Sequence, residues 1–316
     1  MSHRNRLIPC FVATIALTAC GGRDAGLKPE EGYVQVTGGR VWYRIEGSGT
    51  ATPLLVLHGG PGATHHYLKP LGALADERPV IFYDQLGSGR SDRPTDTTLW
   101  RVERFVEELA QVREALGLTE IHLLGHSWGT MLAADYLLTR PAGVRSVILA
   151  SPALSTARWL ADADSLIRTM PDSIQAAIAR HEAAGTFAEP EYQAAVLAFY
   201  QQYLARRMPW SADVDSTLQG FGTPLYNYMW GPSEFTATGT LQSYDRTDRL
   251  GELALPVLFT AGRYDEAMPG TVAFYQMRVP GARLTILDNS AHLTMQDEPD
   301  RYVEIVRAFL HDVEAK

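Results

Sequence analysis

The segment that most constrains the fold is Gly-His-Ser-Trp-Gly at residues 125–129, which directly follows the apolar run Ile-His-Leu-Leu at 121–124. A serine flanked by glycines at this spacing, between a strand and a helix, is typical of a sharp turn that exposes the serine hydroxyl. Residues with a Cβ do not fit the flanks of so tight a turn, which explains the two glycines. The pattern predicts a strand–turn–helix unit that presents Ser127 at the carboxyl edge of a sheet.

Strand-like and helical segments alternate on both sides of this turn. We expect strands at 33–37, 40–46, 53–57, 80–83, 121–124, 146–150, 256–260 and 283–287, the first two joined as a hairpin by Gly38 and Gly39, and helices at 102–116, at 128–139 and at the C-terminal end. This alternation predicts an α/β fold with a mostly parallel sheet and helices on both faces.

The pattern changes between residues 155 and 245, which are rich in aromatic side chains and contain helical stretches but few strand-like runs. We interpret this segment as a helical cap inserted into the sheet domain. The core then comprises residues 31–154 and 246–316, and the cap comprises residues 155–245.

The N-terminal residues differ from the rest of the chain. A basic start at Arg4 and Arg6 precedes the apolar stretch 7–19, which is too short to cross a bilayer comfortably and is typical of a signal peptide. We therefore expect a signal peptide over residues 1–19.

The end of that stretch, Leu-Thr-Ala-Cys at 17–20, resembles the bacterial lipobox, in which the cysteine is lipidated and becomes the mature N-terminus. The alternative is an ordinary cleaved signal in which Cys20 has no role. We expect a lipidated tether over residues 20–30 and a protein anchored by lipid on the periplasmic side of a bacterial membrane. Gly21, by resemblance to lipoprotein sorting rules, favours the outer membrane.

The net charge of the 316-residue chain is −8. Such a chain has no basic face that could neutralise phosphates, so nucleic acid is not an expected partner. No pair of its histidines has a persuasive metal-ligand spacing, and the glycine-rich turn at 87–89 lies outside any Walker or dinucleotide fingerprint. We therefore expect no metal and no cofactor.

A serine hydroxyl needs an imidazole to accept its proton and a carboxylate to orient that imidazole. Asp265 follows the expected strand 256–260, and His292 follows the expected strand 283–287. Each residue alone is weak evidence, but the order Ser127, Asp265, His292 is the order of α/β-hydrolase triads. Both partners also fall beyond carboxyl ends of strands, where such sheets place their ligands. The sequence predicts a catalytic triad.

Attack on an acyl carbon places negative charge on the carbonyl oxygen, which two backbone N–H groups normally stabilise. One comes from the residue after the serine, here Trp128. The other comes from the loop after an early strand, here Gly60 in His-Gly-Gly-Pro-Gly at residues 58–62. We expect Gly60 and Trp128 to form the oxyanion hole.

Taken together, these segments resemble the proline iminopeptidase (prolyl aminopeptidase) family of α/β-hydrolases. The resemblance covers nearly the whole chain after the tether and rests on residues 58–62, 84–91, 125–129, Gly-Pro-Ser-Glu-Phe at 231–235, and 262–266. It implies an α/β-hydrolase fold and the release of an N-terminal residue, often proline, from short peptides. It also implies that Glu234 in the cap and Glu266 beside the catalytic acid bind the substrate's ammonium group.

Two positions depart from the family pattern, because many members have arginine at Leu86 and glycine at His126. Strict proline preference is therefore not implied. Our first hypothesis is a serine aminopeptidase that releases proline or a small apolar residue through an acyl-enzyme. The alternatives are an amino-acid amidase or small-ester hydrolase of the same fold and, more remotely, a non-catalytic ligand-binding protein.

Overall fold

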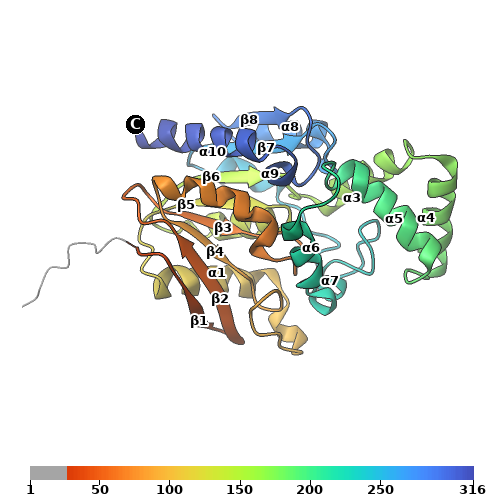
Figure 1. The fold of residues 1–316 in the computed structure, drawn as a ribbon, viewed down its shortest axis with the longest axis horizontal. Coiled ribbons are helices and arrows are strands. Elements are labelled where there is room, and N and C mark those ends of the chain that lie inside the picture. The colour runs from red at the N-terminus through yellow and green to blue at the C-terminus, as the bar shows by residue number, and fades with distance from the viewer. Residues whose placement is uncertain (1–26) are drawn as a thin grey trace, which may run out of the picture.

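A single sheet organises residues 27–316, the part of the chain that the computed structural model describes (Figure 1). Its strands run in the order β1-β2-β4-β3-β5-β6-β7-β8. They are β1 (Glu30–Val36), β2 (Gly39–Glu46), β3 (Leu54–Leu57), β4 (Val80–Tyr83), β5 (Ile121–His126), β6 (Val144–Ala150), β7 (Val257–Gly262) and β8 (Arg283–Leu287). The strands β1 and β2 are antiparallel to their neighbours and all other pairs are parallel, which confirms the predicted mostly parallel sheet.

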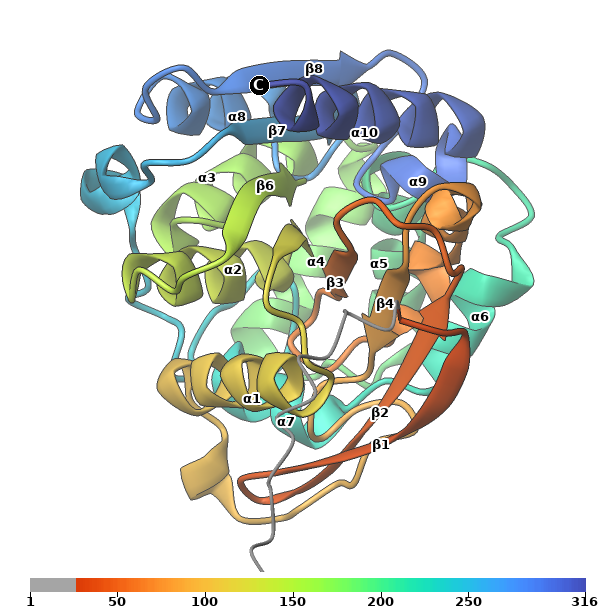
Figure 2. The same ribbon diagram turned by 90° about the vertical axis from the view of Figure 1, so that its left-hand side faces the viewer.

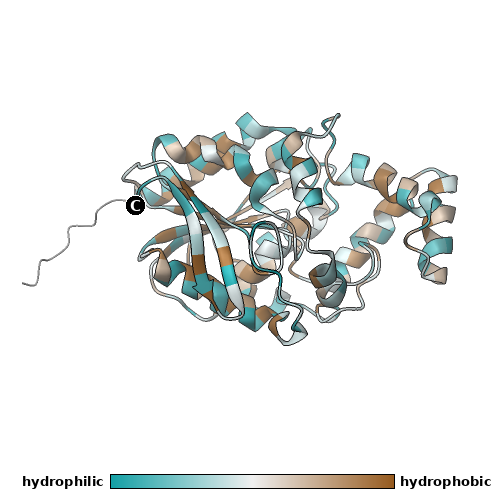
Figure 3. Ribbon diagram, turned by 60° about the horizontal axis from the view of Figure 1, so that its bottom comes forward, coloured by the Kyte–Doolittle hydropathy of each residue, from teal (hydrophilic) through white to brown (hydrophobic). Residues whose placement is uncertain are grey.

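Helices cover both faces of the sheet (Figure 2). One face carries α1 (Val102–Ala115), α2 (Trp128–Leu138) and α8 (Pro269–Gln276), and the other carries the 3-10 helix η1 (His65–Asp76) and α10 (Pro299–Glu314). The central strands β3, β4, β5 and β7 are buried along their whole length, because both faces are covered. The helices carry both hydrophilic and hydrophobic residues (Figure 3), as expected for elements that bury one face.

The cap lies between β6 and β7 and contains α3 (Thr156–Ile167), α4 (Asp172–Ala184), α5 (Pro190–Tyr203), α6 (Ala212–Gln219) and α7 (Thr223–Met229). In Figure 1, α3, α4 and α5 project from one end of the sheet domain. The two ends of the cap lie side by side, because Ser155 and Asp245 form an antiparallel bridge. The Ser155 hydroxyl also donates to the Asp245 carboxylate at 2.8 Å.

The remaining elements are short: the 3-10 helices η2 (Thr97–Leu99) and η3 (Thr247–Glu252) and the helix α9 (Thr294–Asp297). The strand β1 begins at Glu30, one residue inside the expected tether, and Leu27 packs against the core. The expected signal peptide and Cys20 lie outside the described residues. Among the residues described, no helix has the length and apolar composition that crossing a membrane requires.

Candidate active site

Ser127 occupies the sharp turn between β5 and α2. Its backbone has φ 55° and ψ −122°, a region that costs a non-glycine residue free energy. A Cβ on Gly125 would lie 2.2 Å from the main-chain oxygen of Gly129, and a Cβ on Gly129 would lie 2.4 Å from the main-chain oxygen of Leu57. The turn therefore needs both glycines, and it places Ser127 in the wall of a cavity.

Asp265 and His292 meet beyond the carboxyl ends of β7 and β8. The His292 Nδ1–H donates to Asp265 Oδ1 at 2.8 Å, and both side chains are buried. The same carboxylate accepts the main-chain N–H of Ala267 at 2.8 Å and of Gly262 at 3.2 Å. These bonds fix the carboxylate, so the imidazole is held with its Nδ1 protonated and its Nε2 free to accept a proton.

Ser127 and His292 share a cavity of about 400 Å³. Among the hydrogen bonds of residues 27–316, none joins the Ser127 hydroxyl to His292; the Nε2 atom of His292 instead lies 3.7 Å from Glu266 Oε1. Catalytic hydrogen bonds often tighten only when substrate is bound. The structure thus brings the three predicted triad residues together, with the acid–imidazole bond formed.

Gly60 and Trp128 both line the cavity. Within the described part of the chain, neither main-chain N–H donates to a protein acceptor. Gly60 has φ 110°, and a Cβ there would lie 2.5 Å from the main-chain nitrogen of Gly62. The side chain of Trp128 turns into the core, where its indole N–H donates to Gln85 Oε1 at 2.8 Å. Two unpaired backbone donors are therefore available at the positions expected for an oxyanion hole.

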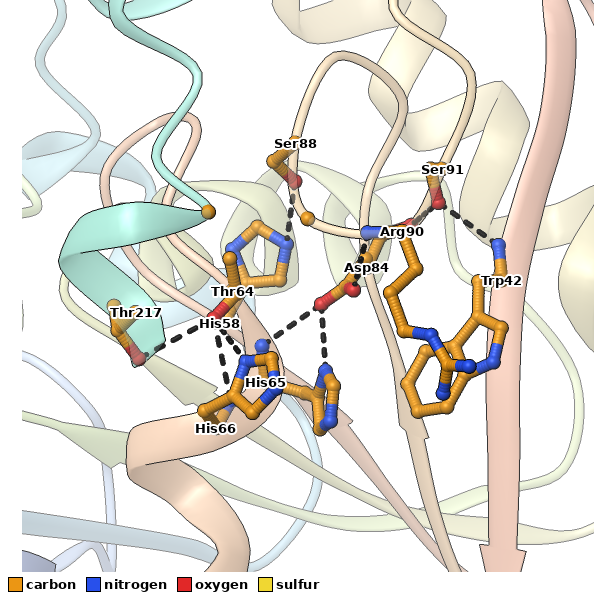
Figure 4. Close-up of polar contacts among 12 residues, drawn as sticks. Trp42, His58, Thr64, His65, His66, Asp84, Ser88, Arg90, Ser91 and Thr217 are labelled. Atoms are coloured by element: carbon orange, nitrogen blue, oxygen red, sulfur yellow. Dashed lines mark hydrogen bonds and ion pairs between the residues drawn. The ribbon is translucent and has the colours of Figure 1, made fainter. Parts of the chain in front are cut away.

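A buried polar network holds the loop that carries Gly60 (Figure 4). Asp84, the residue after β4, accepts the main-chain N–H of His65 at 2.9 Å and the Nδ1–H of the same residue at 2.8 Å. Burial alone would raise the pKa of Asp84, but the bonds and charge of His65 outweigh it and leave that pKa below its ordinary value. His58 accepts the Gln85 N–H at 2.9 Å, and burial lowers the pKa of His58 to about 4. The network is therefore a scaffold in which Asp84 is charged and His58 is neutral.

Glu234 enters the cavity from the loop after α7. Its Oε1 accepts the indole N–H of Trp159 at 2.9 Å, and its Oε2 accepts the hydroxyl of Tyr226 at 2.9 Å. Burial raises the pKa of Glu234 despite these donors. The carboxylate is thus fixed on the cap side of the cavity.

Glu266 reaches the same cavity from the core, directly after Asp265, the predicted catalytic acid. Its side chain is almost wholly buried, and its Oε2 has no hydrogen-bond partner among the described residues. Burial raises the pKa of Glu266 well above its ordinary value, and the charges of Glu234 and Asp265 raise it further. A buried carboxyl pair with an unsatisfied oxygen is suited to a cationic ligand, because such a ligand would supply the missing donor and charge.

Several contacts at the site could not be found from the sequence. Tyr67, Trp159 and Tyr226 line the cavity and hydrogen-bond to site residues, but no motif marks them. Leu86 is fully buried and does not line the cavity, so its departure from the family pattern acts on the core rather than on a ligand. His126, the other position at which the chain departs from the family pattern, lines the cavity. Within residues 27–316, no group of three metal-ligating side chains comes together.

Comparisons with known proteins agree with this geometry. A sequence model of the alpha/beta hydrolase fold matches residues 52–299. The chain is 46% identical over 285 residues to a proline iminopeptidase of Heyndrickxia coagulans, an alignment that covers 90% of this chain and 99% of that protein. These values place the resemblance well above what a shared fold alone would give.

Two solved structures resemble the chain closely. The crystal structure of a proline iminopeptidase from Mycobacterium smegmatis superposes with a TM-score of 0.85 at 34% identity, covering 90% of this chain and 99% of that one. The crystal structure of VinJ superposes with a TM-score of 0.87 at 35% identity, covering 90% of this chain and all of that one (100%). From the motifs, the site geometry and these similarities together, the chain belongs to the proline iminopeptidase family of α/β-hydrolases.

Proposed function

We propose that this chain is a serine aminopeptidase that releases an N-terminal proline or small apolar residue from short peptides. The observation that carries the proposal is the buried pair Glu234 and Glu266 in the cavity that also holds Ser127 and His292. A free N-terminus is an ammonium ion, and its transfer into a largely apolar cavity needs carboxylate partners. The relatives named proline iminopeptidase support the same substrate class.

The reaction proceeds through an acyl-enzyme. Ser127 Oγ attacks the carbonyl carbon of the first residue while His292 Nε2 takes the hydroxyl proton, and Asp265 stabilises the imidazolium that forms. The N–H groups of Gly60 and Trp128 stabilise the oxyanion. The leaving amine departs with the proton from His292, and water then hydrolyses the ester on Ser127 with His292 as the general base. The roles of these five residues remain predictions for kinetic measurement.

The decisive experiment compares proline and alanine anilides with their N-acetylated forms. We expect cleavage of the free amines and at least a 100-fold lower kcat/KM for the acetylated forms, because acetylation removes the ammonium group that Glu234 and Glu266 would bind. A 100-fold change corresponds to about 2.7 kcal/mol. Equal cleavage of both forms would favour the amidase or esterase alternative.

Ser127→Ala tests whether the Ser127 hydroxyl is the nucleophile. It should retain the fold and lose turnover on every acyl substrate. Unchanged turnover would exclude the mechanism, and ligand binding by the parent protein without any turnover would favour a binding protein.

We further propose that the protein is anchored by lipid on Cys20 at the periplasmic side of a bacterial membrane, the outer membrane being favoured. The support is the lipobox-like segment 17–20 and Gly21. The test is partition of the full chain, expressed in a bacterium, into the detergent phase of Triton X-114. The parent should enter the detergent phase and Cys20→Ser should remain in the aqueous phase. Equal partition of the two would exclude the anchor.

A further inference from the structure

His126, the last residue of β5, contacts two segments that carry groups of the proposed mechanism. Its side chain is 1% exposed. The Nε2 atom lies 2.9 Å from the main-chain oxygen of His292, and the Nδ1 atom lies 2.8 Å from the hydroxyl of Tyr67. The two imidazole rings meet edge to face, with centroids 4.6 Å apart. His126 is therefore packed directly behind the proposed general base.

The chemistry of these partners fixes the direction of each hydrogen bond. A carbonyl oxygen can only accept, so Nε2 of His126 carries the hydrogen. Burial, together with the nearby His292, lowers the pKa of His126 well below its ordinary value, so the ring is neutral and Nδ1 accepts the Tyr67 O–H. The Tyr67 oxygen in turn accepts the main-chain N–H of Gly59 at 2.8 Å. The bonds form one directed chain from Gly59 through Tyr67 and His126 to His292.

This chain connects three loops that are remote in the sequence. Gly59 precedes the proposed oxyanion residue Gly60, and a Cβ on Gly59 would lie 3.0 Å from Cβ of Ser127 and 3.1 Å from the Tyr67 oxygen. His126 precedes Ser127 directly. At the far end, the main-chain oxygen of His292 also accepts the Ser151 hydroxyl at 2.9 Å, so both of its lone pairs are used. The oxyanion loop, the nucleophile and the general base thus share one set of buried bonds.

We propose that His126 is a positioning residue, which, through its bonds to Tyr67 and to the main chain of His292, sets the oxyanion loop and the general base relative to Ser127. The inference rests on the proposed catalytic roles of Ser127 and His292. His126 acts through these residues and does not itself exchange a proton with substrate. Displacement of a reacting group by about 1 Å can lower a rate by about 100-fold, so loss of this chain is expected to lower kcat more than it changes KM.

The test measures the rate at which a fluorophosphonate labels Ser127, together with kcat and KM on an alanine anilide. Labelling needs the nucleophile, the general base and the oxyanion hole, but not an ammonium group on the reagent. His126→Phe should lower both the labelling rate and kcat by about 10- to 100-fold, with KM within about threefold of the parent value. His126→Gln keeps one donor and one acceptor and should recover part of the rate.

The matched control is His122→Phe, a buried histidine of the same strand. Its ring bonds to Ser146 and Glu314, and it does not line the cavity. This variant should lose stability and keep the parent labelling rate. A folded His126→Phe variant that labels within threefold of the parent, or an equal loss of rate in His122→Phe, would overturn the inference.

If His126→Phe does not fold, Tyr67→Phe tests whether the hydrogen bonds from Gly59 to His292 position the reacting groups. The variant removes only the hydroxyl that joins Gly59 to His126, so a labelling rate lowered fivefold or more supports the chain and an unchanged rate overturns it. Because the bonds act as a unit, Tyr67→Phe should add little to the effect of His126→Phe in the double variant. Ser127→Ala separates this inference from the function itself, since persistent turnover in that variant would refute the function whatever His126 does.

Discussion

The carboxyl group of Glu266 is almost entirely buried, and one of its oxygens has no hydrogen-bond partner among the described residues. Its pKa is raised well above the ordinary value of 4.5, first by burial and then by the charges of Glu234 and Asp265. At pH values between 4.5, the ordinary pKa that applies to the unfolded chain, and the raised pKa in the folded protein, the unfolded chain binds fewer protons at this carboxyl than the folded one. The free energy of unfolding therefore falls as pH rises through this window. The residue therefore weakens the fold at neutral pH.

Glu266→Gln should reverse this effect, because glutamine keeps the shape and carries no charge. We expect the free energy of unfolding at pH 8 to rise by about 1–2 kcal/mol, with no difference between variant and parent at pH 4. The KM for free-amine substrates should rise at least tenfold, which corresponds to about 1.4 kcal/mol of lost binding. Urea unfolding at the two pH values and steady-state kinetics measure both effects.

The control for this pair of measurements is Glu304→Gln on the exposed face of α10, where the carboxylate pairs with Arg301. Its effect on unfolding should stay within about 0.5 kcal/mol at either pH. If the parent and Glu266→Gln had the same free energy of unfolding at pH 8, burial of the Glu266 carboxyl would not destabilise the folded protein, and the prediction would be wrong.

The unit formed by β5, the turn at Ser127 and α2 depends on close backbone contact with β3. Gly129 lies in the first turn of α2, and a Cβ there would lie 2.4 Å from the main-chain oxygen of Leu57 and 2.9 Å from that of His58. Both atoms belong to backbone that cannot move without disturbing β3 and the loop that carries Gly60. The turn is therefore intolerant of even one added carbon.

Gly129→Ala should lower the free energy of unfolding by about 1–3 kcal/mol, the range for overpacking in a close-packed site, and should lower the labelling rate of Ser127. Gly270→Ala in α8 is the matched control, since no atom counted among residues 27–316 lies within 4 Å of a Cβ there. Alanine is the better helix former, so this variant should be as stable as the parent or more stable, by up to about 1 kcal/mol. Equal effects of the two substitutions in chemical unfolding would contradict the steric account.

Segments with strong local signals were predictable from the sequence. The strands β4 and β8 occur at the predicted residues. The first is the apolar run Val-Ile-Phe-Tyr, and the second, Arg-Leu-Thr-Ile-Leu, begins with alternating polar and apolar residues. The strand β5 extends two residues beyond its predicted end, to His126, because Gly125 and His126 pair with β6. The helices η1 and α8 were not predicted, since Pro70 lies inside the first and the second is only 8 residues long and carries Gly270 near its start.

The order and strand positions of Ser127, Asp265 and His292 were likewise readable from the sequence. The bonds of His126 were not, because its partners Tyr67 and His292 are 59 and 166 residues away in the chain. Such contacts arise only when the sheet order and the loops are known, so sequence patterns give the chemical groups but not the bonds that hold them.

At the scale of the whole molecule, the cap and the core each supply part of the site. The cap helix α3 contacts residues of both parts, because Trp159 donates to Glu234 of the cap and lies edge-on to His292 of the core, with ring centroids 5.4 Å apart. Three residues further along α3, Asp162 accepts the main-chain N–H of Met268 at 3.1 Å and the Thr271 hydroxyl at 2.9 Å. These bonds fasten the cap to the segment that follows Glu266.

Asp162→Ala should weaken the attachment of the cap to the core, so that the distance between Glu234 and Glu266 can vary. The proposed triad lies wholly in the core and should be unchanged. We expect KM for free-amine substrates to rise by about tenfold, equivalent to about 1.4 kcal/mol, with a smaller change in kcat. Asp164→Ala is the control on the same helix, because that carboxylate is exposed and pairs with Arg168 on the surface. A tenfold fall in kcat at constant KM would place the effect on the triad instead of on binding.

The bridge between Ser155 and Asp245 means that all of the cap leaves and rejoins the sheet domain at one point. We expect an insertion of different length between these two positions to leave the strand order of the sheet unchanged. The main-chain N–H of His292 donates to the main-chain oxygen of Tyr203 in the cap at 3.0 Å. We therefore expect exchange of residues 156–244 to change both which peptides are accepted and how the proposed general base is held.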